Sequence, residues 1–256
     1  MSNLILPRRR FLQGAVLGTG GLALAGCDAL VVDDGRRQFA RSAGDRLTHA
    51  AQRSLVGRQS LAREFSPEDM SPVFKANGST MVDTSEYQTH LAEKFANWRL
   101  RVEGLVKSPL SLGLAQLMAM PAREQITRHD CVEGWSAIGK WRGTPLALLL
   151  KAAGLSTRAR YLVFHCADKL DGIPYYESID LVDAFHPQTI LAWSMNGNML
   201  PVAHGAPLRL RAERLLGYKQ AKYIMAVEAV ESLARFGQGN GGYWEDVSGY
   251  EWYGGI

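Results

Sequence analysis

The stretch RHDCVEGWSAIGKWRGTPL (residues 128–146) places one cysteine, Cys131, among charged residues, tryptophans and glycines. A lone cysteine in such a setting can be an inert buried thiol, one half of a disulfide, or a ligand of a group that the chain does not encode. EQITRHDC is typical of a strand, and GTPLALLLKAAGL is typical of a helix with Pro145 near its first turn and Gly154 at its end. Cys131 is therefore expected where a strand ends.

Strands dominate the pattern on both sides of this stretch. NWRLRVEGLV (97–106) alternates between apolar and charged residues, as a half-buried strand does. LSLGLAQLMAM, which ends at Pro121, predicts a short helix. Further strands are expected at ARYLVFHCAD, TILAWSMNG, APLRLRAE and KYIMAVEAVES. Because the few helices do not alternate regularly with the strands, the sequence predicts a strand-rich α+β domain.

The N-terminal segment has the features of an export signal. PRRRFLQ (7–13) is basic, residues 11–26 carry no charge, and LALAGC ends the segment at Cys27. An uncharged stretch this short and rich in Gly and Ala is too weak for a comfortable transmembrane span. The pair Arg8 and Arg9 resembles a twin-arginine signal, and LAGC resembles a lipobox whose cysteine is lipidated. The alternative is an ordinary N-terminal helix with a chance arginine pair.

This interpretation divides the chain into three parts. Residues 1–27 form the twin-arginine-type signal with its lipobox, residues 28–80 an N-terminal helix (36–56) and a loop that leads into the domain, and residues 81–256 the main domain. The mature protein is expected in the periplasm, held at the membrane by its lipid anchor only, and Asp28 favours retention at the inner membrane. Because the twin-arginine route carries folded proteins, the signal also favours a protein that contains a cofactor.

Charge and composition narrow the possible partners. The formal charge of the chain is +4, and the signal holds three arginines and no acidic residue, so the mature part is close to +1. Such a small charge gives no reason to expect nucleic acid as a partner. With 46% hydrophobic and 21% charged residues, the chain has the composition of a globular protein.

The cysteines leave three readings open. If Cys27 carries lipid, Cys131 and Cys166 remain. In an exported domain a disulfide between them is the default expectation, but two inert thiols or a ligand role fit the residues as well. The sequence has no CxxC pair, no CxxCH haem motif and no Walker loop.

A family resemblance favours the ligand role. The cysteine segment quoted above resembles that of the sulfite oxidase superfamily, in the bacterial periplasmic branch that includes the catalytic subunit of protein-methionine-sulfoxide reductase. The likeness continues through AFHPQTILAWSMNGNMLPVAHGAPLRLRAERLLGYKQAKYI (184–224), with a His-Pro turn, HGAPLRL and a Gly-x-Lys cluster in the family's order. The matching motifs extend over most of the mature chain. The resemblance implies the molybdopterin-binding fold of that superfamily.

The resemblance also implies a cofactor and a set of ligands. Enzymes of this family hold molybdenum through one molybdopterin, and their single protein thiolate corresponds here to Cys131, the expected metal ligand and catalytic residue. A soft thiolate suits such a metal, and nearby cations would favour the deprotonated thiol. The candidates close in sequence to Cys131 are Arg128, His129 and Lys140. The family's phosphate-binding residues correspond to Arg209 and Lys222, with Lys219 nearby.

Three further positions correspond to cofactor contacts of the family. His204 lies where the methionine-sulfoxide reductase branch has Asn and the sulfite oxidase branch has His. Cys166 lies where the reductase branch has a Thr that contacts the cofactor, although its alternation with Leu162 and Phe164 also fits plain packing. Asn77 is the candidate for a contact from the N-terminal side.

The implied function is oxygen-atom transfer on a small oxidised or oxidisable sulfur or nitrogen compound. Because the sequence has no haem motif and no flavin site, electrons are expected to pass to or from a separate protein, either a membrane b-type cytochrome or a soluble cytochrome c. The alternative is a non-catalytic lipoprotein that binds a ligand and is held together by a Cys131–Cys166 disulfide.

Overall fold

The computed structural model describes residues 43–44, 47–54 and 57–256 of the chain. The chain forms two units, 1–52 and 53–256, each of which is described by itself. In the first unit the described residues are helical, inside the range where a helix is expected. The signal segment with Cys27, and Asp28 after it, lie outside the described residues.

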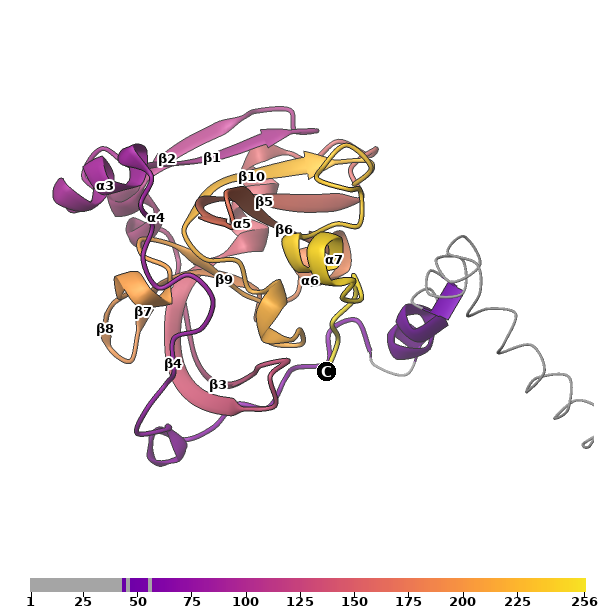
Figure 1. Ribbon diagram of the computed structural model, residues 1–256, viewed down its shortest axis with the longest axis horizontal. Coiled ribbons are helices and arrows are strands. Elements are labelled where there is room, and N and C mark those ends of the chain that lie inside the picture. Colours follow the sequence, from indigo (N-terminus) through magenta and orange to yellow (C-terminus); the bar gives the residue numbers. More distant parts are fainter. Residues whose placement is uncertain (1–42, 45–46, 55–56) are drawn as a thin grey trace, which may run out of the picture. The chain divides into compact units, whose positions relative to one another are not determined.

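Two sheets organise the second unit (Figure 1). In the first sheet the strand order is β2-β1-β10-β5-β6, and only β1 and β10 run parallel. In the second sheet the order is β3-β4-β7-β8, and β9 also pairs with β7. The strands of the first sheet are β1 (Arg99–Gly104), β2 (Leu110–Gly113), β5 (Tyr161–Leu170), β6 (Ile173–Asp180) and β10 (Ile224–Val230). Those of the second are β3 (Arg123–Asp130), β4 (Ser136–Pro145), β7 (Ile190–Met195), β8 (Asn198–Met199) and β9 (Arg209–Arg211).

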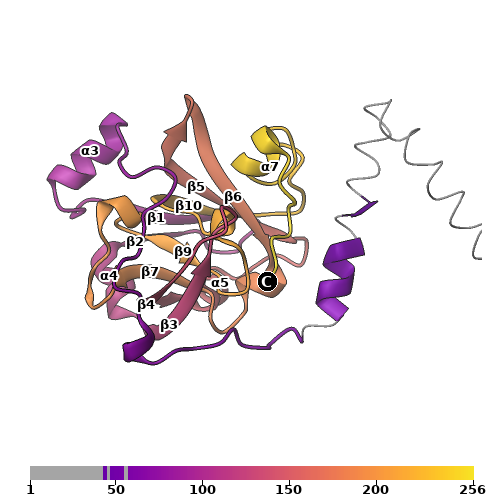
Figure 2. The same cartoon turned by 60° about the horizontal axis from the view of Figure 1, so that its bottom comes forward.

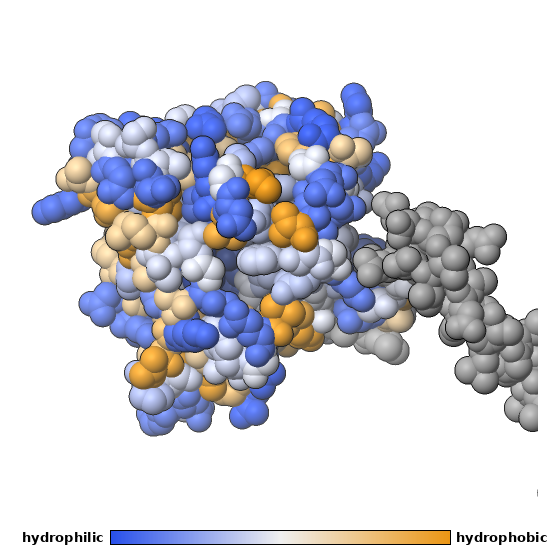
Figure 3. Space-filling view, in the orientation of Figure 1, coloured by the Kyte–Doolittle hydropathy of each residue, from blue (hydrophilic) through white to orange (hydrophobic). Residues whose placement is uncertain are grey.

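Short helices cover the sheets, and α3 and α7 lie on opposite sides of them (Figure 2). The helices are α3 (Ser85–Ala92), α4 (Leu114–Ala119), α5 (Leu146–Ala153), α6 (Leu181–Ala184) and α7 (Tyr243–Ser248), with 3-10 turns η1 (Pro67–Asp69), η2 (Val202–His204) and η3 (Gly217–Lys219). Among the described residues, no helix combines the length and apolar character that a membrane span requires. On the face drawn in Figure 3, hydrophobic residues form small separate areas among hydrophilic ones. The expected α+β class, rich in strands, is confirmed.

The main core lies between the two sheets and joins them. Leu100 from β1 and Phe164 from β5 are fully buried, together with Leu191 from β7 and Leu210 from β9. Helix α5 adds Leu146, Leu149 and Leu150 to the same cluster. Burial of one such side chain contributes about 1.5–3 kcal/mol.

Most of the elements expected from the sequence are present. Strand β1 alternates as expected, and α5 follows Pro145 and ends at Gly154, which adopts a left-handed conformation (φ +66°). Strands β2, β4, β6 and β8 were not expected, and the short helix expected from residue 110 begins only at Leu114, because residues 110–113 form β2. In β4, Lys140 and Arg142 lie on the more open face while Trp141 is fully buried, but glycines occupy other inward positions and hide this alternation in the sequence.

The loop before the domain is part of the same unit. Phe65 donates its backbone N–H to the carbonyl of Ile126 in β3 (2.9 Å), and Ser71 donates to the carbonyl of Ile138 in β4 (3.0 Å). These bonds lay the segment along the β3–β4 hairpin. Its continuation brings Asn77 to the tip of that hairpin, beside Cys131.

Candidate functional site

Cys131 begins the turn between β3 and β4. Its backbone N–H donates to the carbonyl of Trp135 (2.9 Å), and its own carbonyl accepts from Gly134 (3.0 Å), which adopts φ +86°. The side chain is 9% exposed, and the amide of Asn77 donates to its Sγ at 3.4 Å. The hairpin therefore presents the thiol at a fixed place with one hydrogen bond from a distant segment.

The thiol faces a cavity of about 230 Å³, which is lined by residues from six parts of the chain. Asn77, Cys131, His204, Arg209 and Lys222, all expected at the site, line this cavity. The structure thus brings together five of the seven residues expected at the site. The remaining lining includes Phe74, Lys75, Ser79, His129, Val132, Glu133, Trp135, Asp168, Tyr175, Gly217, Tyr218, Gln220, Trp244 and Tyr250.

Two cations in the cavity wall are held by carbonyl oxygens. Lys222 Nζ donates to the carbonyls of Asn77 (2.8 Å) and Ala203 (3.1 Å), and also to that of Ser79. Arg209 donates to the carbonyls of His204 (3.0 Å) and Gln220 (3.4 Å). Neither cation forms an ion pair with a carboxylate from the described part of the chain. The wall therefore carries two cations that lack an ion-pair partner among the described residues, and Asp168 in the same wall attracts Lys222 only from beyond ion-pair distance.

Burial without an ion-pair partner disfavours the charged forms of these side chains and lowers their pKa values. Burial, and to a smaller extent the charge of Arg209, lowers the pKa of Lys222 to about 7. Burial and the neighbouring Arg211 lower the pKa of Arg209 to about 9. Burial, Arg209 and Lys222 lower the pKa of His204 to about 4, so this imidazole is neutral at physiological pH. An anion in the cavity would favour the charged forms of both cations.

The donor set fits the cofactor that the resemblance implies. The cavity offers a soft thiol at one place and two buried cations at another, which suits a group with a thiophilic metal and an anionic phosphate. Three buried atoms of this wall have no hydrogen-bond partner among the described residues: Arg209 Nε, Asp168 Oδ1 and Gln220 Oε1. Buried polar atoms without partners are rare, so these atoms are poised to bind a polar ligand.

His129 is a cavity residue that the sequence reasoning used only as a possible cation near the thiol. Its imidazole is 6% exposed, and burial together with Arg211 lowers its pKa well below the usual range, so it is not a cation. The other two proposed neighbours, Arg128 and Lys140, pair instead with Asp130 and Glu124. Strand alternation could have identified His129, because every second residue of β3 up to Cys131 faces inward.

The disulfide between Cys131 and Cys166, which belonged to the alternative interpretation, is not formed. Both cysteines are free, and Cys166 lies on β5, in the other sheet. Its side chain packs against the main core that contains Leu162 and Phe164, as their alternation predicted. Cys166 lines a second cavity of about 330 Å³ rather than the first, and burial raises the pKa of its thiol.

Lys219 is not available to the cavity. Its ammonium is 1% exposed and donates to Glu177 and Glu245, each at 2.5 Å. The expectation that Lys219 assists in phosphate binding therefore finds no support in its placement. Sequence proximity to Lys222 was misleading, since η3 turns the two side chains to different surroundings.

Comparisons with known proteins identify the family of the chain. The family model described as "Oxidoreductase molybdopterin binding domain" matches residues 87–235. A protein from Azospira oryzae named putative protein-methionine-sulfoxide reductase subunit YedZ1 is 37% identical over 257 residues, which is 98% of this chain and 88% of that protein. The protein-methionine-sulfoxide reductase catalytic subunit MsrP of Ralstonia nicotianae is 34% identical over 235 residues, 88% of this chain and 69% of that protein.

Among solved structures, the sulfane dehydrogenase SoxCD from Paracoccus pantotrophus matches with a TM-score of 0.51 and 21% identity. The match covers 59% of this chain and 41% of that chain, and at this identity it speaks for the fold alone. The family match and the two reductase relatives exclude the alternative of a non-catalytic lipoprotein. With a free thiol and uncompensated cations around one cavity, and a family model that spans more than half of its length, the chain belongs to the molybdopterin-binding oxidoreductases, and its cofactor is molybdenum-molybdopterin.

Proposed function

We propose that this oxidoreductase reduces a sulfoxide to a thioether, and that a separate protein supplies the electrons. The observation that carries the proposal is the meeting of the Cys131 thiol with Arg209 and Lys222 around one cavity. The names of the two relatives, both protein-methionine-sulfoxide reductase subunits, support a sulfoxide as the substrate. In the reaction the S=O bond breaks, the sulfur gains two electrons, and the oxygen leaves with two protons as water.

The chain's own residues hold the cofactor in this proposal. Cys131 binds the metal as a thiolate, and Asn77 fixes its sulfur through the amide hydrogen bond. Arg209 and Lys222 bind the phosphate, and His204, as a neutral imidazole, contacts the pterin. When bound, the cofactor supplies a two-electron redox centre able to exchange an oxygen atom.

The cavity rim beside Cys131 favours a neutral substrate. Phe74 and Trp135 lie there with their rings in edge contact (6.5 Å between centroids), next to the exposed Val132. The nearby Lys75 is compensated by Glu133 at 3.6 Å. An apolar rim with balanced charge suits a sulfoxide on a hydrophobic side chain better than a sulfite anion, which requires a cationic pocket.

The partner and the location belong to the same proposal. The sequence has no haem motif, so a membrane b-type cytochrome or a soluble cytochrome c delivers the electrons. The twin-arginine-type segment and the lipobox support a mature protein in the periplasm that is anchored through Cys27 at the inner membrane. Cys27→Ser should release the protein from the membrane fraction into the soluble periplasm. If the variant stays with the membrane as firmly as the wild type, the lipid anchor is refuted.

The reaction is tested with the purified mature protein and a reduced dye as electron donor. Wild-type protein with about one molybdenum and one pterin per chain should oxidise the dye when a methionine-sulfoxide peptide or a small sulfoxide is added. Cys131→Ser should lose this activity while its circular dichroism stays that of the wild type. Wild-type protein from a host that cannot make the cofactor serves as the inactive control.

Failure to reduce any sulfoxide would overturn the proposal. Cofactor-loaded wild-type protein that turns over no sulfoxide with any donor of sufficient potential would leave the family membership intact but refute this substrate class. Turnover of sulfite by the same preparation would reverse the assigned direction.

A further inference from the structure

His129 lies in the wall of the cofactor cavity, two residues before Cys131 and on the same face of β3. None of the roles proposed so far uses it. The aromatic rings of Phe74 and Trp135 flank its imidazole, with ring centroids at 5.6 and 5.7 Å. The ring is therefore held in one orientation, and the hydrogen-bonding state of its two nitrogens decides what it can do.

The contact with Arg211 sets that state. Arg211 Nη1 lies 3.0 Å from His129 Nδ1. A guanidinium has only donors, so Nδ1 must accept this bond and cannot carry a proton. The single proton of the neutral ring is then on Nε2, which makes Nε2 a hydrogen-bond donor.

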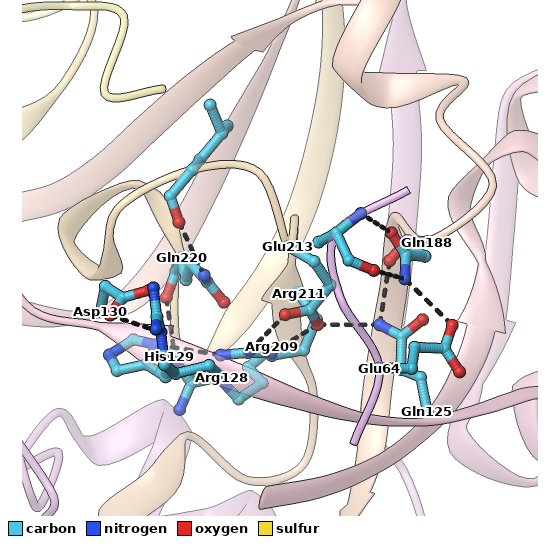
Figure 4. A network of polar contacts seen from close by, with 12 residues as sticks. Glu64, Gln125, Arg128, His129, Asp130, Gln188, Arg209, Arg211, Glu213 and Gln220 are labelled. Carbon is cyan, nitrogen blue, oxygen red and sulfur yellow. Dashed lines mark hydrogen bonds and ion pairs between the residues drawn. The ribbon is translucent and has the colours of Figure 1, made fainter. Parts of the chain in front are cut away.

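A buried chain of polar contacts holds Arg211 in place (Figure 4). Arg211 is 0% exposed and donates to both carboxylate oxygens of Glu213, through Nε at 3.0 Å and Nη2 at 2.5 Å. Gln125 donates to Glu213 at 2.8 Å and to the carbonyl of Gln188 at 3.0 Å. Because every member of this chain is buried, its geometry fixes the tautomer of His129.

The other side of the ring is open to the cavity. Nε2 has no hydrogen-bond partner among the described residues and is not sealed from solvent. It faces Gly217, where a Cβ atom would come within 2.6 Å of Nε2, so the glycine leaves the space that the imidazole needs. Gly217, Arg209 and Lys222 line the same cavity.

We propose that His129 donates its Nε2–H to the anionic phosphate end of the cofactor, beside Arg209 and Lys222. The N–H is preset toward a cavity whose wall also holds the unpartnered Nε–H of Arg209 and the ammonium charge of Lys222, and an anion is the ligand that all three would attract. His129 is thus a cofactor-binding residue, and Arg211 with Glu213 are positioning residues that act through it. This role depends on the cofactor and not on the substrate or the direction of the reaction.

Cofactor retention tests the role without any turnover. His129→Met removes the donor at similar volume, and His129→Gln places an amide N–H near the position of Nε2. Loaded protein is incubated in dilute urea, and the release of molybdenum and of fluorescent pterin is followed with time. A hydrogen bond to a charged group accounts for a factor of about ten or more, so His129→Met should lose the cofactor about ten times faster, and His129→Gln should stay within about threefold of wild type.

Two results would overturn the role: release from His129→Met at the wild-type rate, or release from His129→Gln as fast as from His129→Met. Nitrogen-15 NMR of histidine-labelled wild-type protein gives a second test that no variant can spoil by misfolding. It should show the proton of His129 on Nε2, and a proton on Nδ1 would refute the assignment. Absence of sulfoxide turnover in wild-type protein would refute only the proposed reaction. Cofactor release from His129→Met at the wild-type rate would refute only the role of His129, so the two results can be told apart.

Discussion

At the scale of single residues, the site depends on cations that the protein itself does not neutralise. Lys222 has three carbonyl oxygens as partners and Arg209 has two, so both are oriented but neither is compensated. Carbonyl dipoles stabilise a buried cation less than a carboxylate does, which is why burial lowers both pKa values. The unloaded protein is therefore expected to lose stability at these positions, and the cofactor's anionic group to restore it.

The loss of stability caused by burying Lys222 in the cofactor-free protein should depend on pH. The pKa of Lys222 falls from 10.5 to about 7 in the folded, cofactor-free protein, so between these values the unfolded chain binds more protons than the folded one. The destabilisation is complete below about pH 7 and is relieved as the pH rises toward about 10. Cofactor-free wild type should gain free energy of unfolding, relative to Lys222→Met, between about pH 7 and about pH 9. Urea unfolding of both proteins measures the difference, and identical pH profiles would contradict the assignment.

At the scale of elements, two close contacts hold the framework around the cavity. The first is the crossing of β4 and β7, where the register shifts between Arg142 and Gly143. A Cβ at Gly143 would collide with the carbonyl oxygen of Leu191 and come within 2.6 Å of Ala192 Cα. The second is the ion-pair cluster of Lys219, which joins η3 to β6 and α7.

Gly143→Ala should destabilise the protein by about 1–3 kcal/mol, because the backbone of β7 must move to admit the methyl group. Gly44→Ala, in the helical first unit, is a control that adds a methyl group without a clash, since a Cβ at Gly44 meets nothing within 4 Å. Thermal unfolding of both variants gives the comparison. Equal melting temperatures would show that β4 and β7 can separate without cost.

Lys219→Met should be the more damaging change, at about 3–5 kcal/mol, because it leaves two buried carboxyl groups without their counter-charge. Glu177→Gln is a milder control: burial and the neighbouring Glu245 raise the pKa of Glu177 well above its usual range, so this carboxyl tends toward its neutral form. Urea unfolding monitored at equilibrium ranks the variants. A larger loss for Glu177→Gln than for Lys219→Met would mean that the charge assignment is wrong.

At the scale of the whole molecule, the cavity exists only when distant segments meet. Its lining includes the loop at Asn77, the β3–β4 turn, the segments at 203–209 and 217–222, and Trp244 with Tyr250 from the C-terminal part. A ligand that contacts so many segments stabilises the native state as a whole, since the unfolded chain cannot bind it in this way.

Loaded protein should therefore melt well above cofactor-free protein of the same sequence. A ligand present at about 100 times its Kd contributes about 2.7 kcal/mol, and 1 kcal/mol corresponds to about 2–4 °C for a chain of this size. Differential scanning calorimetry of protein from hosts with and without cofactor synthesis measures the shift. Coincident transitions would indicate that the cofactor binds without organising the cavity.

Local sequence patterns were enough to predict the fold class, the family and the cofactor of this protein. Alternating and continuous apolar runs fixed the strand-rich α+β class, and the cysteine segment with its HGAPLRL partner identified the family and the cofactor. These patterns are local, and strand or helix periodicity is a property of neighbouring residues. Cys131, Arg209 and Lys222 could be named for the same reason, because each stands in a contiguous motif.

The tertiary structure decided which side chains meet. Cys166 packs against the main core and lines the second cavity, so it neither pairs with Cys131 nor reaches the first cavity. Lys219 forms ion pairs with Glu177 and Glu245, both distant along the chain. The hydrogen bond from Arg211 determines which nitrogen of His129 carries the proton. Such partners come together only through long-range packing, and the low dielectric of the interior then makes each contact decisive for charge and protonation.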